Sequence, residues 1–328
     1  MTHMNPVRIA ILGTRFGEPM IEQSELAEFS PELILDSAGN AEQLVSAAQG
    51  AVAILAGAPP KFTRDVLQQL PECRCIVRYG VGIESIDLEA ATENGIIVAN
   101  VPDYATEEVA THAVSLALAW VRKLFPAHQA IMGGTWQVAI VRPLFSTENQ
   151  TAGIIGFGKI GQAVARKLRP FGFDLLVHDP YATPGALQEH GARSVELSEL
   201  LEQSDVISLN APLTEGTRHL INADTLKQMK STAFLVNTSR GGLIDEVALA
   251  AALENEEIAG AALDVLEQEP ITPDHPLLKS DRVILTPHMA WYTVQAAARM
   301  RELACQEVAR ILRGEKPVNL VNRAVMDG

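Results

Sequence analysis

Residues 151–162 read TAGIIGFGKIGQ, an apolar run that passes through three glycines into a helical pattern. Gly156, Gly158 and Gly161 have the spacing G-x-G-x-x-G, in which the first glycine makes a tight turn and the second lets the backbone approach a pyrophosphate. The third lets helix and strand pack closely, and the helix N-terminus offers free N–H groups to phosphates. A bare motif is weak evidence, but its place between strand and helix patterns predicts a dinucleotide site rather than an unliganded glycine-rich turn.

The next strand pattern, residues 173–178, ends at Asp179. An acidic side chain about 20 residues after the glycines binds the ribose hydroxyls in such sites. The carboxylate would also repel a 2′-phosphate, so the sequence favours NAD over NADP. The alternative is that Asp179 only caps the turn before Pro180.

Short apolar runs alternate with helical patterns on both sides of this loop. The runs are residues 7–12, 32–35, 51–56, 73–77, 96–100, 151–156, 173–178, 205–210, 233–238, 260–265 and 282–286. Strands of this kind, separated by helices, are typical of parallel sheets buried on both faces. We therefore expect an α/β protein with two doubly wound parallel-sheet domains, one flavodoxin-like and one Rossmann, with a cleft between them.

The chain length of 328 residues also favours two domains, although a single α/β barrel is an alternative. Residues 105–132 form a long, mostly apolar helical pattern that we expect to kink or end near Pro126. The helical pattern 293–312 is expected to return to the first domain. The expected domains are residues 1–102 with 289–328, which bind substrate, and residues 103–288, which bind NAD.

The composition excludes two classes of partner. The net charge is −14, from 40 acidic and 26 basic side chains, and this field repels nucleic acid and anionic membrane surfaces. The most apolar helical pattern, near 109–121, contains His112 and has charged neighbours, so no membrane span is expected. The N-terminal MTHMNPVR lacks the apolar region of a signal peptide. We expect a cytoplasmic protein.

The three cysteines do not have the spacing of a metal or redox motif. Cys73 and Cys75 are separated by one residue, and Cys305 is distant. They are expected to be buried thiols in a reducing compartment, and no metal site is expected.

Three charged residues follow other strand patterns of the second domain: Arg240, Glu269 and His288. Open parallel sheets bind ligands at these strand ends. A guanidinium can hold a carboxylate through two parallel hydrogen bonds, and a carboxylate beside an imidazole favours its protonated form. Taken singly, they could be a structural ion pair, an exposed loop acid and a core histidine. Together they predict a proton donor to a carbonyl, or a base toward an alcohol.

The stretches GIIGFGKIGQ, VHDPY, LVNTSRGGLIDE, GAALDVLEQEP and LTPHMAWY, in this order, resemble the D-isomer-specific 2-hydroxyacid dehydrogenases. The similarity runs from about residue 50 to residue 312 and looks closest to the branch of the C-terminal-binding-protein co-repressors. The resemblance implies that Arg240, Glu269 and His288 are the catalytic trio and that the cofactor is NAD. It also implies a two-fold dimer interface formed by the 105–132 region.

The resemblance implies further contacts with both ligands. For the cofactor these are Gly156, Phe157, Gly158, Lys159, Ile160, Gly161, Asp179, Pro180, Asn210, Ala211, Pro212, Thr217, Thr238, Ser239, Asp264, His288, Ala290 and Thr106. For the substrate they are Arg78, Val81, Gly82, Arg240, His288 and Trp291. Trp291 would wall the substrate pocket, and the alternative for it is packing alone.

The expected function is NAD-dependent interconversion of a 2-oxo acid and a D-2-hydroxy acid. Glu84-Ser85 and Met289 depart from the residues usual in the family and leave the substrate open. Met289 and Trp291 favour a modest apolar or thioether side chain, whereas Arg78 would suit a distal anion, as in 3-phosphohydroxypyruvate. The alternatives are therefore phosphoglycerate dehydrogenase-type activity and, in another class, an NADH-sensing, peptide-binding co-repressor-like role.

Overall fold

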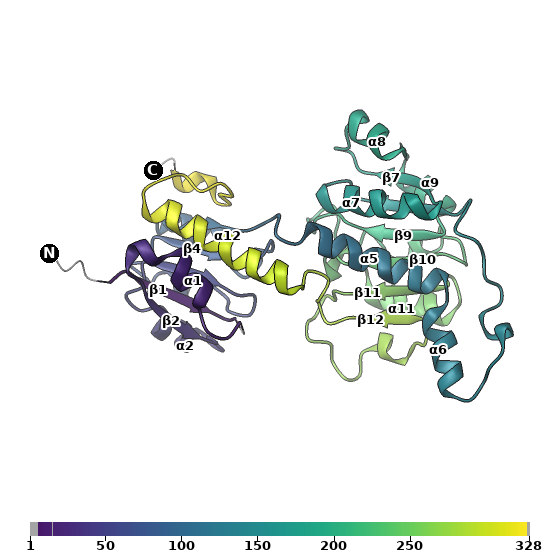
Figure 1. Ribbon diagram of the computed structural model, residues 1–328, viewed down its shortest axis with the longest axis horizontal. Coiled ribbons are helices and arrows are strands. Elements are labelled where there is room, and N and C mark those ends of the chain that lie inside the picture. The colour runs from purple at the N-terminus through teal and green to yellow at the C-terminus, as the bar shows by residue number, and fades with distance from the viewer. Residues whose placement is uncertain (1–5, 15, 327–328) are drawn as a thin grey trace. The chain divides into compact units, whose positions relative to one another are not determined.

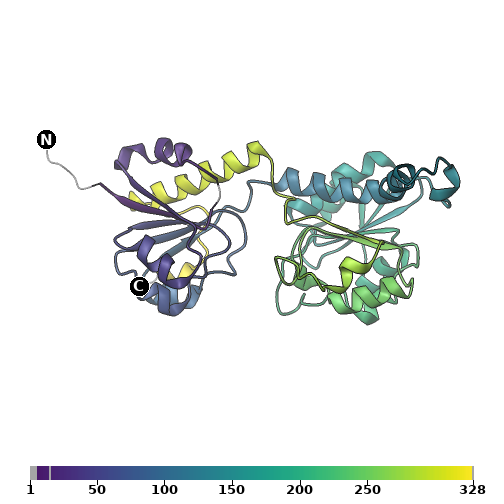
Figure 2. The same ribbon diagram turned by 90° about the horizontal axis from the view of Figure 1, so that it is seen from below.

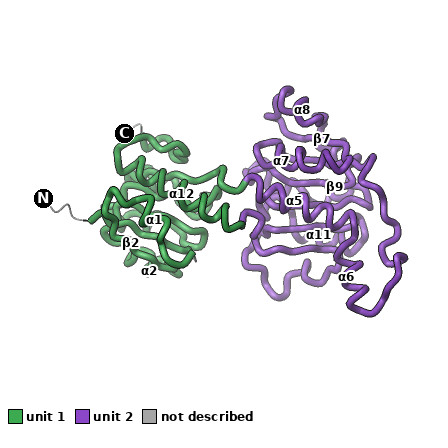
Figure 3. Tube along the Cα trace, in the orientation of Figure 1, with its two compact units in different colours: residues 1–105, 293–328 green, residues 106–292 purple. Residues whose placement is uncertain are grey.

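The computed structural model describes residues 6–14 and 16–326, and the chain forms two compact units (Figure 3). The first unit comprises residues 1–105 and 293–328, and the second comprises residues 106–292. Both boundaries fall at helix starts, a few residues beyond the boundaries expected from the sequence, so Met289–Tyr292 belong to the second unit. The expectation about the N-terminal MTHMNPVR concerns in part residues 1–5, which lie outside the described residues.

The first unit is built on a five-stranded parallel sheet of order β2-β1-β3-β4-β5 (Figure 1). Its strands are β1 (Arg8–Leu12), β2 (Glu32–Asp36), β3 (Ala53–Ala56), β4 (Cys75–Arg78) and β5 (Ile97–Ala99). This is the flavodoxin-like order, as expected. Every residue of β3, AILA, is buried, because helices cover both faces of this central strand.

The helices of the first unit are α1 (Met20–Glu25), α2 (Ala41–Ala48), α3 (Arg64–Leu67), α4 (Leu88–Glu93) and α12 (Val294–Leu312). Figure 2 shows α1 and α12 together on one face of the sheet and α2 on the other. The sequence did not predict α1. Its buried face carries Glu22 rather than an apolar side chain, so its six residues have no readable helical period.

The segment after α12 covers the outer edge of this sheet. Leu320 forms an antiparallel bridge with Ala99 of β5. The buried side chain of Asn322 accepts a hydrogen bond from the Val98 N–H at 2.8 Å and donates one to the Ile96 carbonyl at 2.9 Å. The backbone groups of the edge strand are thereby paired rather than exposed.

The second unit contains a seven-stranded parallel sheet of order β12-β11-β10-β9-β6-β7-β8. Its strands are β6 (Thr151–Ile155), β7 (Asp174–His178), β8 (Ala192–Ser194), β9 (Val206–Leu209), β10 (Phe234–Asn237), β11 (Gly260–Leu263) and β12 (Val283–Leu285). This is the Rossmann order with one further strand at the β12 edge, and the strand order reverses between β6 and β9. The sequence did not predict β8, whose three residues, ARS, are mostly polar and exposed.

The helices of the second unit are α5 (Thr106–Val121), α6 (Leu124–Met132), α7 (Lys159–Leu168), α8 (Pro184–His190), α9 (Leu197–Gln203), α10 (Ala223–Leu226) and α11 (Glu246–Glu254). Helices α5 and α7 pack on one face of the sheet, with Phe234 and Val236 in their core. Helices α9, α10 and α11 cover the other face, with Leu235 and Ile207. Neighbouring residues of one strand therefore serve opposite cores, as a sheet buried on both faces requires.

The expected long helical region 105–132 is two helices, with a break near Pro126 as the sequence suggested. The break is at Lys123, whose φ of 50° ends α5 in the left-handed region. Pro126 instead lies in the first turn of α6, where its missing N–H would have no intrahelical partner in any case. Within the described residues, no helix combines the length and the apolar character needed to cross a membrane.

Candidate active site

The glycine loop lies between β6 and α7, beside the point where the strand order reverses. At Gly156, whose φ is +89°, a Cβ would lie 2.6 Å from the backbone nitrogen of Ala211, and at Gly161 it would lie 2.1 Å from the Gly156 carbonyl oxygen. At Gly158 a Cβ would have no atom within 4 Å. The first and third glycines therefore permit close backbone packing, while the second borders open space, as the loop of a pyrophosphate site requires.

Asp179 follows β7 directly and lies beside this loop. Its carboxylate accepts hydrogen bonds from the Phe157 N–H at 2.6 Å and from the Tyr181 N–H at 2.7 Å. Asp179 is thus a turn cap, the alternative weighed above, and it is also fixed against the glycine loop. Each carboxylate oxygen has a further lone pair that a ribose hydroxyl could use.

The residues after β9 and β10 continue the same edge of the sheet. Thr217 closes the loop that begins at Asn210, since its hydroxyl donates to the Pro212 carbonyl at 2.7 Å. Thr238 is buried, and its hydroxyl oxygen has no hydrogen-bond partner among the described residues. A buried hydroxyl without a partner costs free energy, so it indicates a ligand group in this position. Together with the glycine loop, this fits a bound dinucleotide.

Arg240 lies on the turn between β10 and the short 3-10 helix η4 (Gly241–Leu243). The buried side chain of Asn237 holds this turn, because it donates to the Arg240 carbonyl at 2.8 Å and accepts from the Ser239 N–H at 3.0 Å. At Gly241 a Cβ would lie 1.9 Å from the Leu266 backbone carbon. The first glycine after Arg240 therefore lets the loop that follows β11 pack directly on the arginine turn.

Glu269 and His288 form a hydrogen-bonded pair, with 2.7 Å between Glu269 Oε2 and His288 Nδ1. The other oxygen of Glu269 accepts from the Leu266 N–H at 3.0 Å. Burial raises the pKa of Glu269, but the hydrogen bond and charge of His288, the Leu266 N–H and the charge of Arg240 outweigh it, so the pKa is lowered. An ionised carboxylate on Nδ1 leaves Nε2 as the ring nitrogen that can exchange a proton with a substrate.

Asp264 holds the turn that presents His288. Its buried carboxylate accepts hydrogen bonds from the Thr286 hydroxyl at 2.5 Å, the Met289 N–H at 2.9 Å and the Ala290 N–H at 2.8 Å. His288 itself has a φ of +51°, an uncommon value for a non-glycine residue that this turn must hold in place. The expected cofactor contacts Asp264 and Ala290 thus lie at this turn, and Asp264 already serves to shape it.

The remaining expected residues of the second unit lie at or near the same strand ends. Lys159 and Ile160 begin α7, Pro180 follows Asp179, and Thr106 begins α5. Trp291 contacts Tyr292 edge-on, with 5.4 Å between ring centroids. Met289 and Tyr292 expose 42% and 54% of their surface, so this turn presents apolar area to solvent.

The substrate candidates Arg78, Val81 and Gly82 lie at the end of β4 in the first unit. A buried cluster fixes this loop, since the Tyr79 hydroxyl donates to Glu22 at 2.7 Å and Arg301 Nε donates to the same oxygen at 2.8 Å. Burial raises the pKa of Glu22, but these hydrogen bonds and the charge of Arg301 lower it overall. Arg78 donates to the Ala56 carbonyl at 3.3 Å.

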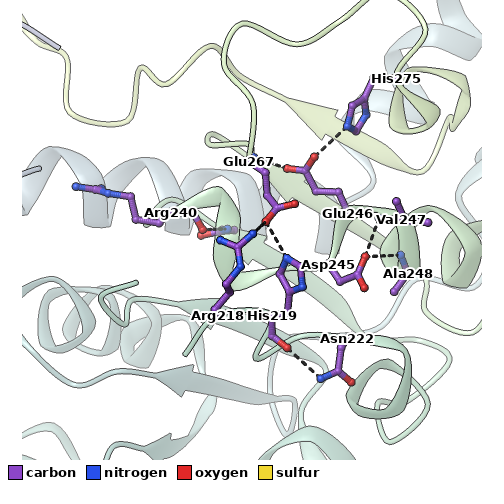
Figure 4. A network of polar contacts seen from close by, with 11 residues as sticks. Arg218, His219, Asn222, Arg240, Asp245, Glu246, Val247, Ala248, Glu267 and His275 are labelled. Atoms are coloured by element: carbon purple, nitrogen blue, oxygen red, sulfur yellow. Dashed lines mark hydrogen bonds and ion pairs between the residues drawn. The ribbon is translucent and has the colours of Figure 1, made fainter. Parts of the chain in front are cut away.

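The sequence did not single out five polar residues of the second unit that contact one another: Arg218, His219, Glu246, Glu267 and His275. Figure 4 shows Arg218 and His219 directed at Glu267, and His275 at Glu246. The pairs are up to 49 residues apart in the chain, so no local spacing signals them. Asp245, directly before Glu246, caps α11 and accepts from the Ala248 N–H at 3.0 Å.

The chain has relatives among known proteins. A family model for the D-isomer specific 2-hydroxyacid dehydrogenase, NAD binding domain, matches residues 114–290. A glyoxylate reductase of Korarchaeum cryptofilum is 42% identical over 265 residues, which cover 80% of each protein. A D-3-phosphoglycerate dehydrogenase of Methanocaldococcus jannaschii is 38% identical over 282 residues, 86% of this chain and 53% of that protein. The apo-structure of D-lactate dehydrogenase from Escherichia coli matches with a TM-score of 0.84 and 32% identity, covering 96% of this chain and 99% of that chain. These relatives do not confirm a co-repressor branch.

Proposed function

The chain belongs to the D-isomer specific 2-hydroxyacid dehydrogenase family and has its NAD-binding domain, and we propose that it reduces a small 2-oxo acid to the D-2-hydroxy acid with NADH. The observation that carries the proposal is the Glu269–His288 pair, 2.7 Å apart, at the strand ends that also present the glycine loop and Arg240. An imidazole oriented by a carboxylate beside a dinucleotide site suits proton-coupled reduction of a carbonyl.

NADH, when bound, supplies the hydride that adds to C2 of the 2-oxo acid. We assign the proton to His288, which transfers it from Nε2 to the carbonyl oxygen while Glu269 stabilises the imidazolium through Nδ1. Arg240 holds the substrate carboxylate through its guanidinium, and so places the reacting carbon. Arg78 and the N–H groups of Val81 and Gly82 are proposed as further carboxylate ligands. The glycine loop, Asp179 and Thr238 are proposed as cofactor contacts.

For the substrate we favour a 2-oxo acid with a small or modest apolar side chain. The relatives named glyoxylate reductase act on the smallest such acid, and the exposed apolar side chains of Met289 and Tyr292 next to Trp291 would suit a larger one. The test is turnover of glyoxylate, pyruvate and 4-methyl-2-oxopentanoate, followed by loss of NADH absorbance. NADH binding without turnover of any 2-oxo acid would instead support an NADH-sensing role.

A second candidate is phosphoglycerate dehydrogenase-type activity. It is supported by the 38% identity to a D-3-phosphoglycerate dehydrogenase and by Arg78, which could meet a distal anion. The same assay with 3-phosphohydroxypyruvate separates the two candidates. A wide preference for the phosphorylated acid would favour the second.

We further propose that the protein is a homodimer through the α5–α6 region and the segment that follows it. This region exposes large apolar side chains, among them Leu124, Met132, Trp136, Val138 and Phe145. Exposed apolar patches of this kind are typical of protein interfaces. Sedimentation of the wild type should give twice the chain mass of 35.4 kDa.

We also propose a reducing, cytoplasmic location. Cys73, Cys75 and Cys305 are buried as free thiols. Proteins that keep thiols unpaired belong to reducing compartments.

A further inference from the structure

A group of charged side chains joins two loops of the second unit and takes no part in the mechanism above (Figure 4). Glu267 Oε1 accepts hydrogen bonds from Arg218 Nη2 at 3.0 Å and from His219 Nε2 at 2.7 Å. Arg218 and His219 lie on the loop after β9, which carries the candidate cofactor residue Thr217. Glu267 lies two residues before Glu269 on the loop after β11. One carboxylate therefore bridges a candidate cofactor loop and the loop of a candidate catalytic residue.

The backbone of Glu267 is fixed independently of its side chain. Its N–H donates to Glu246 Oε1 at 2.7 Å, and Glu246 Oε2 accepts from His275 Nε2 at 2.9 Å. His275 Nδ1 accepts from the Leu277 N–H at 3.3 Å, so the neutral ring carries its proton on Nε2. This bond holds Glu246 without requiring a charged histidine. The side chain of Glu267 is thus directed at the β9 loop from an anchored position.

The third loop of the site lies between these two. The His219 N–H donates to the Gly242 carbonyl at 2.8 Å, and the missing side chain of Gly241 makes room for the backbone of Leu266 and Glu267. The Arg240 turn is therefore in contact with the β9 loop on one side and with the β11 loop on the other. The bonds from Glu267 to Arg218 and His219 close this arrangement across the turn.

The backbone at His219 has an unusual conformation. Its φ is +50°, in the left-handed region that glycine adopts freely and that other residues adopt at a cost. The Asn222 side chain holds this conformation by donating to the His219 carbonyl at 3.0 Å. A glycine would satisfy the backbone alone, whereas the histidine also supplies the ring that donates to Glu267.

We propose that Glu267 is a positioning residue that couples the cofactor loop, residues 210–219, to the loop that presents Glu269 to His288. When a bound dinucleotide orders residues 210–219, the loop that presents Glu269 becomes ordered as well. The Glu269–His288 pair is thereby aligned. The proposal rests on the function proposed above for this site. It assigns Glu267 no contact with substrate or cofactor.

The first test measures loop order without turnover. Amide hydrogen exchange is compared for the full-length wild type, Glu267→Ala and a control, Glu199→Ala, with and without NADH. Glu199 pairs with Arg193 at 2.6 Å on the surface of the same unit, far along the sheet at β8 and α9. Glu267→Ala should raise amide exchange in both residues 210–219 and residues 264–269. In this variant NADH should no longer slow exchange in residues 264–269. Unchanged exchange, or a change in the 264–269 loop alone, would overturn the coupling.

The second test is kinetic. Because small misplacements of reacting groups cost up to about 100-fold, Glu267→Ala should lower kcat by about tenfold or more and raise KM for NADH. Glu267→Gln, which keeps an acceptor oxygen, should recover most of the KM effect. When Glu269→Gln is already present, Glu267→Ala should lower kcat by only about twofold or less. The effects of two substitutions are not additive when one residue acts through the other. Full additivity would overturn the positioning role.

The two proposals fail in different ways. A wild type that binds NADH but reduces no 2-oxo acid contradicts the proposed function, while the exchange pattern still decides whether Glu267 couples the loops. Glu267 and His219 are 30% and 36% exposed, so Glu267→Ala should fold normally, which equal thermal midpoints of the variant and the control would verify.

Discussion

Glu269→Gln should shift the pH profile of the proposed reaction to lower pH, both for reduction and for oxidation. Keto-acid reduction needs protonated His288, and the ionised carboxylate, 2.7 Å from Nδ1, stabilises that form. Glutamine keeps the shape and a hydrogen-bonding oxygen but loses the charge. The alkaline loss of reduction activity should therefore move to lower pH. In the oxidation direction neutral His288 is the base, and activity is lost on the acid side of the profile. This acid limb should move to lower pH as well.

The size of the shift follows from the geometry of the pair. Charge centres about 4 Å apart interact by about 1 kcal/mol in water and about 4 kcal/mol near a protein surface. The side chains of His288 and Glu269 are 47% and 37% exposed, so solvent screening places the interaction near the lower end, at about 1–2 kcal/mol.

The assay is kcat/KM against pH in both directions, measured for the wild type, Glu269→Gln and a matched control, Glu256→Gln. Glu256 is an exposed acid of the same unit that pairs with Arg282. The control should leave both limbs in place. A Glu269→Gln enzyme with both limbs unmoved would remove Glu269 from the mechanism, and the pair would then be structural only.

Four further outcomes are expected. His288→Ala should lower the rate constant of keto-acid reduction, measured in single-turnover assays, by roughly 10²–10⁴-fold. This is the usual contribution of general acid–base catalysis. Asp179→Ser should narrow the ratio of kcat/KM for NADH over NADPH, and a wild type that uses both equally would contradict the assignment of this carboxylate. Trp291→Ala should lower kcat/KM more for 4-methyl-2-oxopentanoate than for glyoxylate, and the difference should correspond to about 1–3 kcal/mol of transition-state stabilisation. An equal loss on both acids would make the indole a packing residue. Glu22→Gln should lower the free energy of unfolding at neutral pH by about 1–3 kcal/mol in urea titrations, because Arg301 stays buried without its counter-charge. Since the pKa of Glu22 is lowered on folding, the wild type should lose this advantage as the pH falls through that lowered pKa, and a constant difference would count against the ion pair.

The sequence was most informative where one local pattern determined the structure. Continuous apolar runs such as AVAILA predicted the buried parallel strands, because residues on both faces of such a strand must be apolar. The glycine loop was predicted with the role of each glycine. The Glu269–His288 contact followed only from combining strand ends, and its distance could not be read from spacing.

Features that depend on distant partners could not be predicted. Glu22 interrupts the apolar period of α1 because its partner, Arg301, is supplied by α12. Pro126 indicated a break near its own position, but it could not indicate that the left-handed residue would be Lys123. Glu267 is one of two acids in VLEQEP, and its bonds to Arg218 and His219 appear only in three dimensions.

The edge contact of the C-terminal segment has a consequence for how the protein is made. Residues 106–292 form the second unit without interruption, so they can fold as soon as they leave the ribosome. The first unit begins to emerge earlier, yet its β5 edge stays unpaired until Leu320 and Asn322 have been synthesised. The part of the molecule that is translated first is thus completed last, and in the meantime a nascent chain exposes a strand edge to its neighbours.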